Sequence, residues 1–426
     1  MSAAWRRAMP AKGGKRSSRT AAAVISGVLA GCAHAINPPA YAMNAPGSAL
    51  PAVTSPASLS VKVEGNHLVD GNGAPLQLRG VSVSGLEFVA VQGWSPANPW
   101  GATRPDWGAI RKWSANAVRI PLNEASWLGY SCVDGKGATR NPDPGHNYKK
   151  TVAETVQQAT AAGLYVVLDL HWSAPEKYCP LLQNPMADAD HSIDFWSSVA
   201  TQFKGSPNVL FELFNEPFVG YGGPVSAADW RTTMRGGAMR QFLTVNPTTQ
   251  GWDKIDSTWQ VAGMQQMLDA VRATGATNVV LAGTPSWSQD ISQWIENAPR
   301  DPLHQLGVAW HPYPNSNAAG DPQALVPKLG PKAYEWAEHI LAADYPILIT
   351  ETGDHNAPGT RGSPYLANLL PWADAHGISY FGWGWNVWGD KDNVLIKDAS
   401  GTPTDGYGVE FKRHLASVAR TVSSSR

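Results

Sequence analysis

The stretch from residue 165 to residue 216 decides the fold, because it contains a complete strand–helix–strand unit. It begins with the apolar run YVVLDLH (165–171), continues through the amphipathic segment DHSIDFWSSVATQF (190–203) and ends with a second apolar run, VLFELFNE (209–216). Short apolar runs of this kind are typical of strands buried on both faces, and a helix between two of them predicts a parallel pair.

The same alternation extends over most of the chain. Six further apolar runs predict strands at 76–83, 117–122, 278–283, 306–313, 346–351 and 378–385. Further amphipathic stretches predict helices at 147–162, 258–274, 331–343, 363–376 and 407–420. Eight strands alternating with helices favour a single closed (β/α)8 TIM barrel over an open doubly wound sheet. No glycine-rich fingerprint follows the first strand, which disfavours a dinucleotide-binding fold.

The segments on either side of the barrel differ from it in composition. We expect the barrel domain to span residues 59–420, with a short β-hairpin over 61–73 at its start and a C-terminal tail at 421–426. Residues 33–58 are rich in Ala, Pro and Ser, which predicts a tether rather than a folded unit.

Residues 1–31 predict an export signal, because six basic residues and no acid accompany an apolar stretch at 21–30. The apolar stretch is too short to span a bilayer as a mature helix. Leu29-Ala30-Gly31-Cys32 resembles the lipobox of bacterial lipoproteins, which would make Cys32 the lipidated first residue. The A-x-A-like sites at 33–35 and 40–42 offer simple cleavage instead. We favour the lipid anchor and expect an outer-membrane or cell-surface location, with a periplasmic or secreted protein as the alternative.

Charge and cysteine content narrow the choice of partners. The whole chain carries 33 basic and 34 acidic residues, and setting aside the six basic residues of the signal leaves 27 against 34. A basic face that could neutralise phosphates is not expected, so nucleic acid is not an expected partner. Cys132 and Cys179 both follow predicted strands; in an oxidising compartment they form either a disulfide between neighbouring loops or two free thiols.

The 19 tryptophans suggest a carbohydrate ligand, because flat rings with a polar edge suit the faces of sugars. Some of them must belong to the core. Five on expected loops are either sugar platforms or ordinary packing residues: Trp94, Trp100, Trp230, Trp252 and Trp259.

Polar and aromatic side chains gather where the predicted strands end. Functional residues of a (β/α)8 barrel lie at the C-terminal ends of the strands, and burying ionisable groups there is costly unless each is paired or used. The candidates are Arg119, His171, Asn215, Glu216, His311, Tyr313, Glu351, Trp383 and Trp385.

Glu216 and Glu351 are the central pair, because they close the fourth and seventh strands on opposite sides of the barrel. Two carboxylates about 5–5.5 Å apart suit retaining glycoside hydrolysis, in which one attacks the anomeric carbon and the other donates and then removes a proton. The acid needs a raised pKa and the nucleophile a lowered one. By strand order, Arg119 and Tyr313 are placed to donate to the nucleophile.

The motif FELFNEP at 211–217 resembles the acid/base signature of the cellulase family, glycoside hydrolase family 5. Further segments are similar to that family's motifs in its order and on its strands: Gly80-Val81, Gly85-Leu86-Glu87, Arg119-Ile120-Pro121, Leu168-Asp169-Leu170-His171, His311-Pro312-Tyr313 and Thr350-Glu351. The resemblance covers about residues 59 to 420 and implies a catalytic barrel.

The resemblance also implies roles for these residues. Glu216 would be the acid/base and Glu351 the nucleophile, and Asn215 would bind the sugar 2-hydroxyl. The remaining polar residues of the same subsite would be Arg119, His171, His311 and Tyr313. A tryptophan of the last strand would form its floor; Trp383 and Trp385 share a face by strand parity, and we favour Trp383. The family uses no metal or cofactor, so none is expected here.

These features predict a monomeric enzyme that cleaves a β-linked polysaccharide or oligosaccharide, foremost an endo-β-1,4-glucanase. A β-mannanase or another β-glycan hydrolase on the same barrel is the first alternative, because glucose and mannose differ only at C2. A catalytically inert carbohydrate-binding surface protein is the second. Residues 217–257 form a long insertion that leaves endo and exo action open. Asp169 and Glu212, deeper in the barrel, are interpreted as structural residues or as supports of the site residues.

Overall fold

The computed structural model describes residues 59–95, 97–219, 224–246, 251–314, 325–356, 359, 361–387 and 393–424, with side chains as far as Arg420. The expected export signal and tether, with Cys32, lie outside the described residues. In the part of the chain that is described, no helix is long and apolar enough to cross a bilayer.

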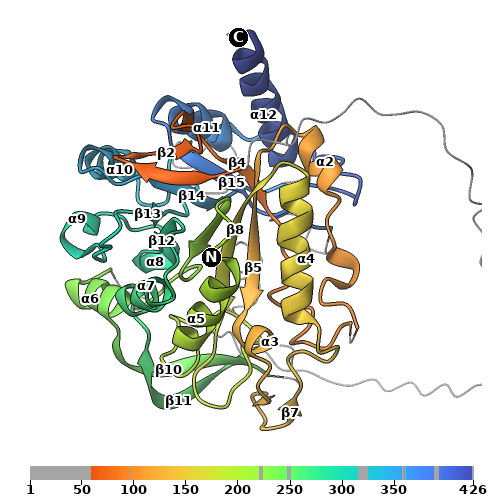
Figure 1. Cartoon of the computed structure of the whole chain (residues 1–426), viewed down its shortest axis with the longest axis vertical. Helices are drawn as coiled ribbons and strands as arrows, with labels where there is room; N and C mark the ends of the chain where they lie inside the picture. The colour runs from red at the N-terminus through yellow and green to blue at the C-terminus, as the bar shows by residue number, and fades with distance from the viewer. Residues whose placement is uncertain are drawn as a thin grey trace, which may run out of the picture.

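Eight parallel strands close into a barrel, as predicted (Figure 1). Its last strand pairs with its first through Tyr380 and Arg79, which completes the ring. The eight strands are, in chain order, β4 (Arg79–Ser82), β5 (Ala117–Asn123), β8 (Tyr165–Trp172), β9 (Val209–Glu212), β12 (Val280–Ala282), β13 (Leu306–Ala309), β14 (Ile347–Thr352) and β15 (Ser379–Gly382). Nearly every residue of these strands is buried, which explains why they appear in the sequence as continuous apolar runs.

Helices surround the barrel and bury their apolar sides against it (Figure 1). The longer ones are α2 (Trp107–Lys112), α4 (Tyr148–Ala161), α5 (Ser192–Phe203), α7 (Met264–Ala273), α10 (Lys332–Ala342), α11 (Pro364–Ala375) and α12 (Tyr407–Ser424). Shorter elements in the loops are η1 (Gly101–Thr103), α3 (Glu124–Leu128), α8 (Pro285–Ser288) and α9 (Trp294–Asn297). The last helix extends to Ser424, beyond the boundary expected at residue 420.

A small sheet closes the N-terminal end of the barrel. The expected hairpin forms from β1 (Val61–Glu64) and β2 (His67–Asp70), and β3 (Pro75–Leu76) adds a third strand. The run predicted as one strand at 76–83 is therefore divided between β3 and β4. Side chains of the hairpin pack against the N-terminal end of the barrel interior. There they form one apolar cluster with Ala117, Tyr165, Val167 and Leu210.

The insertion at 217–257 folds into a helix and a hairpin. These are α6 (Ala227–Arg235), β10 (Gly237–Val245) and β11 (Trp252–Val261). The helix predicted at 258–274 consequently begins only at Met264, because the residues before it pair with β10. Figure 1 shows the hairpin at the end of the barrel toward which β5 points. It is therefore positioned at the C-terminal face of the strands.

Cys132 and Cys179 form a disulfide, which selects one of the two alternatives left open by the sequence. Cys132 lies in β6 (Cys132–Val133), which pairs with β7 (Thr139–Arg140) in the loop after β5; Cys179 lies in the loop after β8. The bridge joins these two loops inside a separate apolar cluster.

Replacing both cysteines by alanine should lower the free energy of unfolding by about 2–5 kcal/mol, because the bridge closes a loop of 47 residues in the unfolded chain. Urea unfolding measured with and without reductant tests this. Reductant should lower the stability of the wild-type protein to that of the double variant and leave the variant unchanged. Equal stability of both proteins in the absence of reductant would contradict the prediction.

Candidate active site

The candidate residues of the fourth, sixth and eighth strands lie just beyond the regular strands, which are shorter than the runs 209–216, 306–313 and 378–385 predicted. The N–H of Asn215 still donates to Leu170 of the neighbouring strand β8 at 3.1 Å, whereas that of His311 donates to Ser288 of α8 at 2.7 Å. Prolines at 217 and 312 remove the N–H groups that a continued ladder would need. The side chains nevertheless emerge at the C-terminal face, as the barrel predicts.

Glu216 and Glu351 come together there with His311. One carboxylate oxygen of each glutamate and a ring nitrogen of His311 all lie within 4.8 Å of one another. All three side chains are almost completely buried. This closeness agrees with the short carboxylate distance of retaining hydrolysis.

Arg119 of β5 holds the carboxylates of the site together. Its Nε and Nη2 donate to the two oxygens of Glu212, at 2.6 and 3.2 Å. Nη2 also lies 2.7 Å from Asn215 Oδ1 and 2.9 Å from an oxygen of Asp169, and Nη1 donates to Glu351 at 3.2 Å. The guanidinium is fully buried, and these carboxylates raise the pKa of Arg119 against the opposing effect of burial. It is a permanent cation shared by three strands.

His311 supplies a second positive charge. Its Nδ1 lies 3.2 Å from Glu216, and its Nε2 contacts Thr350 Oγ1 at 2.9 Å and Glu212 at 3.3 Å. Burial acts to lower the pKa of His311, but the hydrogen bonds to Glu212 and Glu216 outweigh it and raise the pKa to about 9. Arg119 and His311 together lower the pKa of Glu212 to about 2, although burial opposes them.

Glu351 and Glu216 differ in the donors that they receive. Tyr313 Oη donates to one oxygen of Glu351 at 2.7 Å, and Arg119 donates to the other. Both donors predicted for the nucleophile are therefore in contact with Glu351. Glu216 instead contacts His311.

The protonation of the pair differs from the sequence-based expectation. Burial, followed by the negative charge of Glu216, raises the pKa of Glu351, whereas a nucleophile was expected to have a lowered pKa. Arg119 cannot prevent this because Asp169 and Glu212 share its charge. The imidazolium of His311 meanwhile favours the carboxylate form of Glu216. Two carboxylates this close titrate as a coupled pair that shares one proton.

His171 and Trp383 form the wall beside the pair. His171 Nδ1 contacts Asp169 at 2.6 Å, and its ring stacks on Trp383 with centroids 5.5 Å apart and planes 2° apart. Burial lowers the pKa of His171 to about 4, so the ring is neutral at physiological pH.

Trp385 corrects the parity argument, because it does not share the face of Trp383. Its ring packs edge-on against Trp113 with centroids 5.0 Å apart, inside the core between barrel and helices. Strand parity does not apply to either tryptophan, since β15 ends at Gly382. Trp383 therefore lies beside His171, whereas Trp385 has a packing role.

The tryptophans on the loops also separate into two groups. Trp100, Trp230 and Trp259 are buried and belong to the core, whereas Trp94 is 69% exposed. Trp94 lies on the loop after β4, 5.1 Å from Phe88 in an edge-on contact, and Phe88 lies 6.4 Å from Trp172. These aromatic rings lead from the residue after His171 to the surface.

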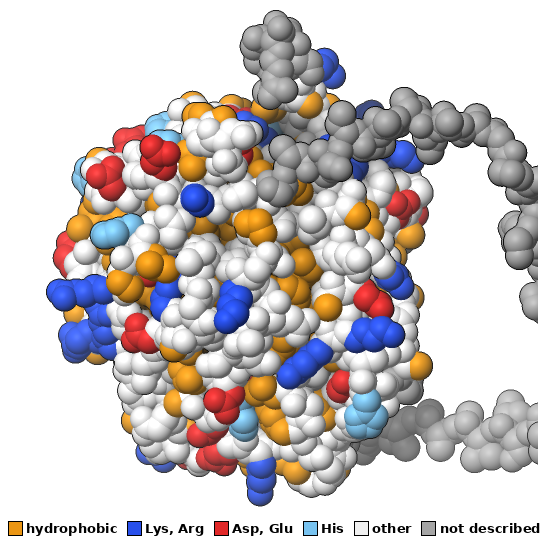
Figure 2. All heavy atoms as spheres, viewed as in Figure 1, with side chains coloured by type: hydrophobic (Ala, Val, Ile, Leu, Met, Phe, Trp, Pro, Cys, Tyr) orange, Lys and Arg blue, Asp and Glu red, His pale blue; other side chains and the backbone are white. Residues whose placement is uncertain are grey.

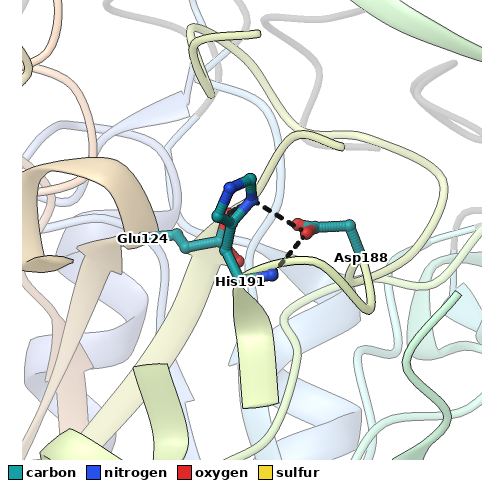
Figure 3. A group of neighbouring side chains, drawn as sticks. All are labelled: Glu124, Asp188 and His191. Carbon is teal, nitrogen blue, oxygen red and sulfur yellow. Dashed lines mark hydrogen bonds and ion pairs between the residues drawn. The ribbon is translucent and has the colours of Figure 1, made fainter. Parts of the chain in front are cut away.

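A second group of possible cation ligands lies in the loops after β5 and β8, where Glu124, Asp188 and His191 approach one another (Figure 3). Their atoms are already used: Asp188 accepts hydrogen bonds from the backbone N–H and Nδ1 of His191, at 2.9 and 3.1 Å. Glu124 accepts from Tyr130 Oη at 3.1 Å and from Ser192 Oγ at 2.5 Å. We interpret this group as a structural link between the two loops. The expected absence of metal and cofactor stays a prediction.

Charge on the surface is mixed. On the face shown in Figure 2, Lys and Arg side chains stand in small groups among Asp and Glu side chains. Nucleic-acid binding requires a continuous basic face, so this surface gives that function no support.

Three residues of the site were missed or undervalued from the sequence. Asp169 and Glu212, interpreted as structural or as supports of the site residues, are the anionic partners of Arg119. The available signal was their place two residues before His171 and four residues before Glu216. Gln183 contacts both Asn215 and Glu216 from a loop without any motif.

Comparison with known proteins agrees with this geometry. The sequence model of the family described as cellulase (glycosyl hydrolase family 5) matches residues 69–389. An endoglucanase of Clostridium saccharobutylicum is 23% identical over 355 residues, which are 81% of this chain but only 60% of that relative.

Two solved structures show the same fold. A β-glucanase of Saccharophagus degradans, solved in complex with cellotetraose, has a TM-score of 0.56 and 22% identity, with 85% of this chain and 94% of that chain covered. A β-mannanase of Streptomyces thermolilacinus has a TM-score of 0.51 and 21% identity, with 83% and 91% covered. With the matched family and the paired glutamates on one barrel face, this chain belongs to the cellulase family, glycosyl hydrolase family 5.

Proposed function

We propose that the chain is a retaining endo-β-1,4-glucanase in which Glu351 is the nucleophile and Glu216 the acid/base. The observation that carries the proposal is the pair of buried carboxylates within 4.8 Å, of which only Glu351 contacts both Arg119 and Tyr313. Those two donors orient Glu351 for attack and stabilise it as a leaving group in the second step.

The reaction proceeds in two displacements. Glu351 attacks the anomeric carbon while the glycosidic bond breaks, and the departing oxygen takes the proton of Glu216. Water then attacks the same anomeric carbon as Glu216 removes its proton, and the bond between that carbon and the Glu351 oxygen breaks. The shared proton must therefore lie on Glu216 when the glycan is bound. Once Glu351 is esterified its negative charge is gone, so the pKa of Glu216 falls and Glu216 becomes the base.

The side chains around Glu216 and Glu351 could bind one sugar ring. We assign the contact with the 2-hydroxyl to Asn215, whose Nδ2 carries two donors and uses one of them on Gln183. Trp383, held by the neutral ring of His171, would form the apolar floor. His311 and Tyr313 complete the subsite.

Hydrolysis by the full chain of carboxymethyl-cellulose, mannan and mixed-linkage β-glucan tests the substrate. We expect the enzyme to cut the glucans at internal bonds of the polysaccharide and to release products of many lengths. Cleavage of mannan alone would agree with the assignment of the catalytic residues but overturn the assignment as a glucanase. Release of one short product would show action at the ends of the polysaccharide. A folded protein that cuts none of them would favour an inert carbohydrate-binding protein.

Trp94 supports a longer glycan-binding track, because its exposed ring continues an aromatic row that runs from Trp172, near the C-terminal end of β8, through Phe88. Replacing Trp94 by alanine should raise KM for cellohexaose by about 3- to 10-fold, since an aromatic contact contributes about 0.5–1.5 kcal/mol. KM for an aryl cellobioside should not change. Ile295→Ala removes another exposed apolar side chain, 49% exposed, and is the matched control. An equal change with both substrates would contradict the prediction.

We also propose that the protein is exported, anchored through a lipid on Cys32 and monomeric. The basic and apolar N-terminal segment and the lipobox-like sequence before Cys32 support export and lipidation. Metabolic labelling with palmitate in a bacterial host should label the wild-type protein and not Cys32→Ser. Labelling of neither would favour simple cleavage and secretion.

Light scattering of the detergent-free Cys32→Ser variant should give the mass of one chain.

A further inference from the structure

Gln183 is a buried amide that connects the two functional residues at the end of β9. It lies in the loop between β8 and α5, with 6% of its surface exposed. Its Nε2 donates to the backbone oxygen of Glu216 at 2.7 Å, and its Oε1 accepts from Asn215 Nδ2 at 2.8 Å. Neither contact involves the carboxylate of Glu216, so Gln183 does not touch the reacting atoms.

These hydrogen bonds have a defined direction. A backbone oxygen can only accept, so the NH2 group of Gln183 must face Glu216 and its oxygen must face Asn215. Asn215 Oδ1 accepts from Arg119 at 2.7 Å, which orients the same amide from its other side. A continuous series of hydrogen bonds thus runs from Arg119 to Asn215, from Asn215 to Gln183 and from Gln183 to the backbone of Glu216. One N–H of the Asn215 amide remains to bind a ligand.

We infer that Gln183 is a positioning residue, which orients the Asn215 amide toward the sugar 2-hydroxyl and holds the backbone of the acid/base. The inference rests on the proposed function. A hydrogen bond to the 2-hydroxyl strengthens in the transition state, so an amide that is free to rotate loses transition-state stabilisation more than substrate binding.

The same loop connects this position to the inserted hairpin. Asn184, the next residue, accepts from the backbone N–H of Leu243 in β10 at 2.7 Å, and its Nδ2 donates to Ser173 at 2.8 Å. The backbone N–H of Phe218 donates to Pro185 at 2.9 Å. The inserted segment therefore supports the loop that carries Gln183.

Gln183→Met in the full chain tests the inference, because methionine retains the shape of the side chain and removes both hydrogen bonds. On 2,4-dinitrophenyl β-cellobioside we expect kcat to fall about 10- to 100-fold with KM changed less than about twofold. On the analogue that lacks the 2-hydroxyl of the sugar joined to the leaving group, wild type and variant should agree within about twofold.

Gln305→Met is the matched control, since Gln305 also makes two backbone hydrogen bonds, to Val63 at 2.9 and 3.1 Å, at the opposite end of the barrel. The free energy of unfolding of Gln305→Met, measured in urea, should fall by about as much as that of Gln183→Met. Its kcat should equal that of the wild-type protein. Gln183→Glu restores both hydrogen bonds only when protonated, so its kcat relative to wild type should rise as the pH falls.

A Gln183→Met variant with wild-type kcat, or one that loses the same factor on both substrates, would overturn the inference. If Gln183→Met does not fold, a Gln183→Glu protein whose activity relative to wild type is independent of pH would overturn it. A wild-type protein that cleaves no β-glucoside would instead contradict the proposed function, and the inference with it.

Discussion

Glu351→Ala is expected to lower kcat/KM on a β-glucan by about 10,000-fold or more, the effect of removing a covalent nucleophile. Azide added to the variant with 2,4-dinitrophenyl β-cellobioside should restore turnover and yield the α-glycosyl azide. The reason is geometric: azide enters from the side that Glu351 has left and displaces the aryl group with inversion.

Glu216→Ala is the matched variant, because it removes the other carboxylate of the pair. It should retain cleavage of the dinitrophenyl substrate, whose leaving group needs little proton donation, and azide should yield the β-glycosyl azide from the glycosyl-enzyme. Product configuration is read by proton NMR. The opposite pairing of variants and anomers would exchange the two roles.

Arg119→Met should have the largest effect on stability, with a loss of about 3–5 kcal/mol in the free energy of unfolding at pH 7. The substitution leaves Asp169, Glu212 and Glu351 buried around a missing cation. Activity should be lost at the same time, because Glu351 and Asn215 lose a donor.

The difference between wild type and Arg119→Met should decrease in acid. Arg119 contributes to lowering the pKa of Glu212 to about 2. A lowered pKa stabilises the folded protein above the unfolded pKa, and that stability is lost as the pH falls toward 2. Urea unfolding at pH 7 and pH 3 tests the sign, with Arg272→Met as control because Arg272 pairs with Asp301 at 2.8 Å far from the site. An Arg119→Met protein as stable as wild type at pH 7 would contradict the prediction.

The barrel could be predicted because each of its strands is buried on both faces. Runs such as YVVLDLH have no solvent-facing side, so hydrophobicity alone locates them and the helices between them. The candidate site was predicted from the fold, since Arg119 and Glu351 are polar residues within buried barrel strands and Glu216 follows the end of β9.

The insertion could not be predicted in the same way. Strands β10 and β11 pair mainly with each other and expose much of both faces, so they contain no continuous apolar run. Trp385 was misplaced because strand parity was extended past Gly382, where the strand ends. Gln183 had no signal at all, since its role depends on which loop the fold brings against Asn215.

The most direct test of the account is the configuration of the first product released from a β-glucan oligosaccharide. Cellotetraose incubated with the full chain in an NMR tube should give the β-anomer first, followed by slow mutarotation, and Glu216→Gln and Glu351→Gln should each lose cleavage. Initial release of the α-anomer would show inversion and contradict the short carboxylate separation within 4.8 Å. Undiminished cleavage by either variant would contradict the two-glutamate mechanism itself.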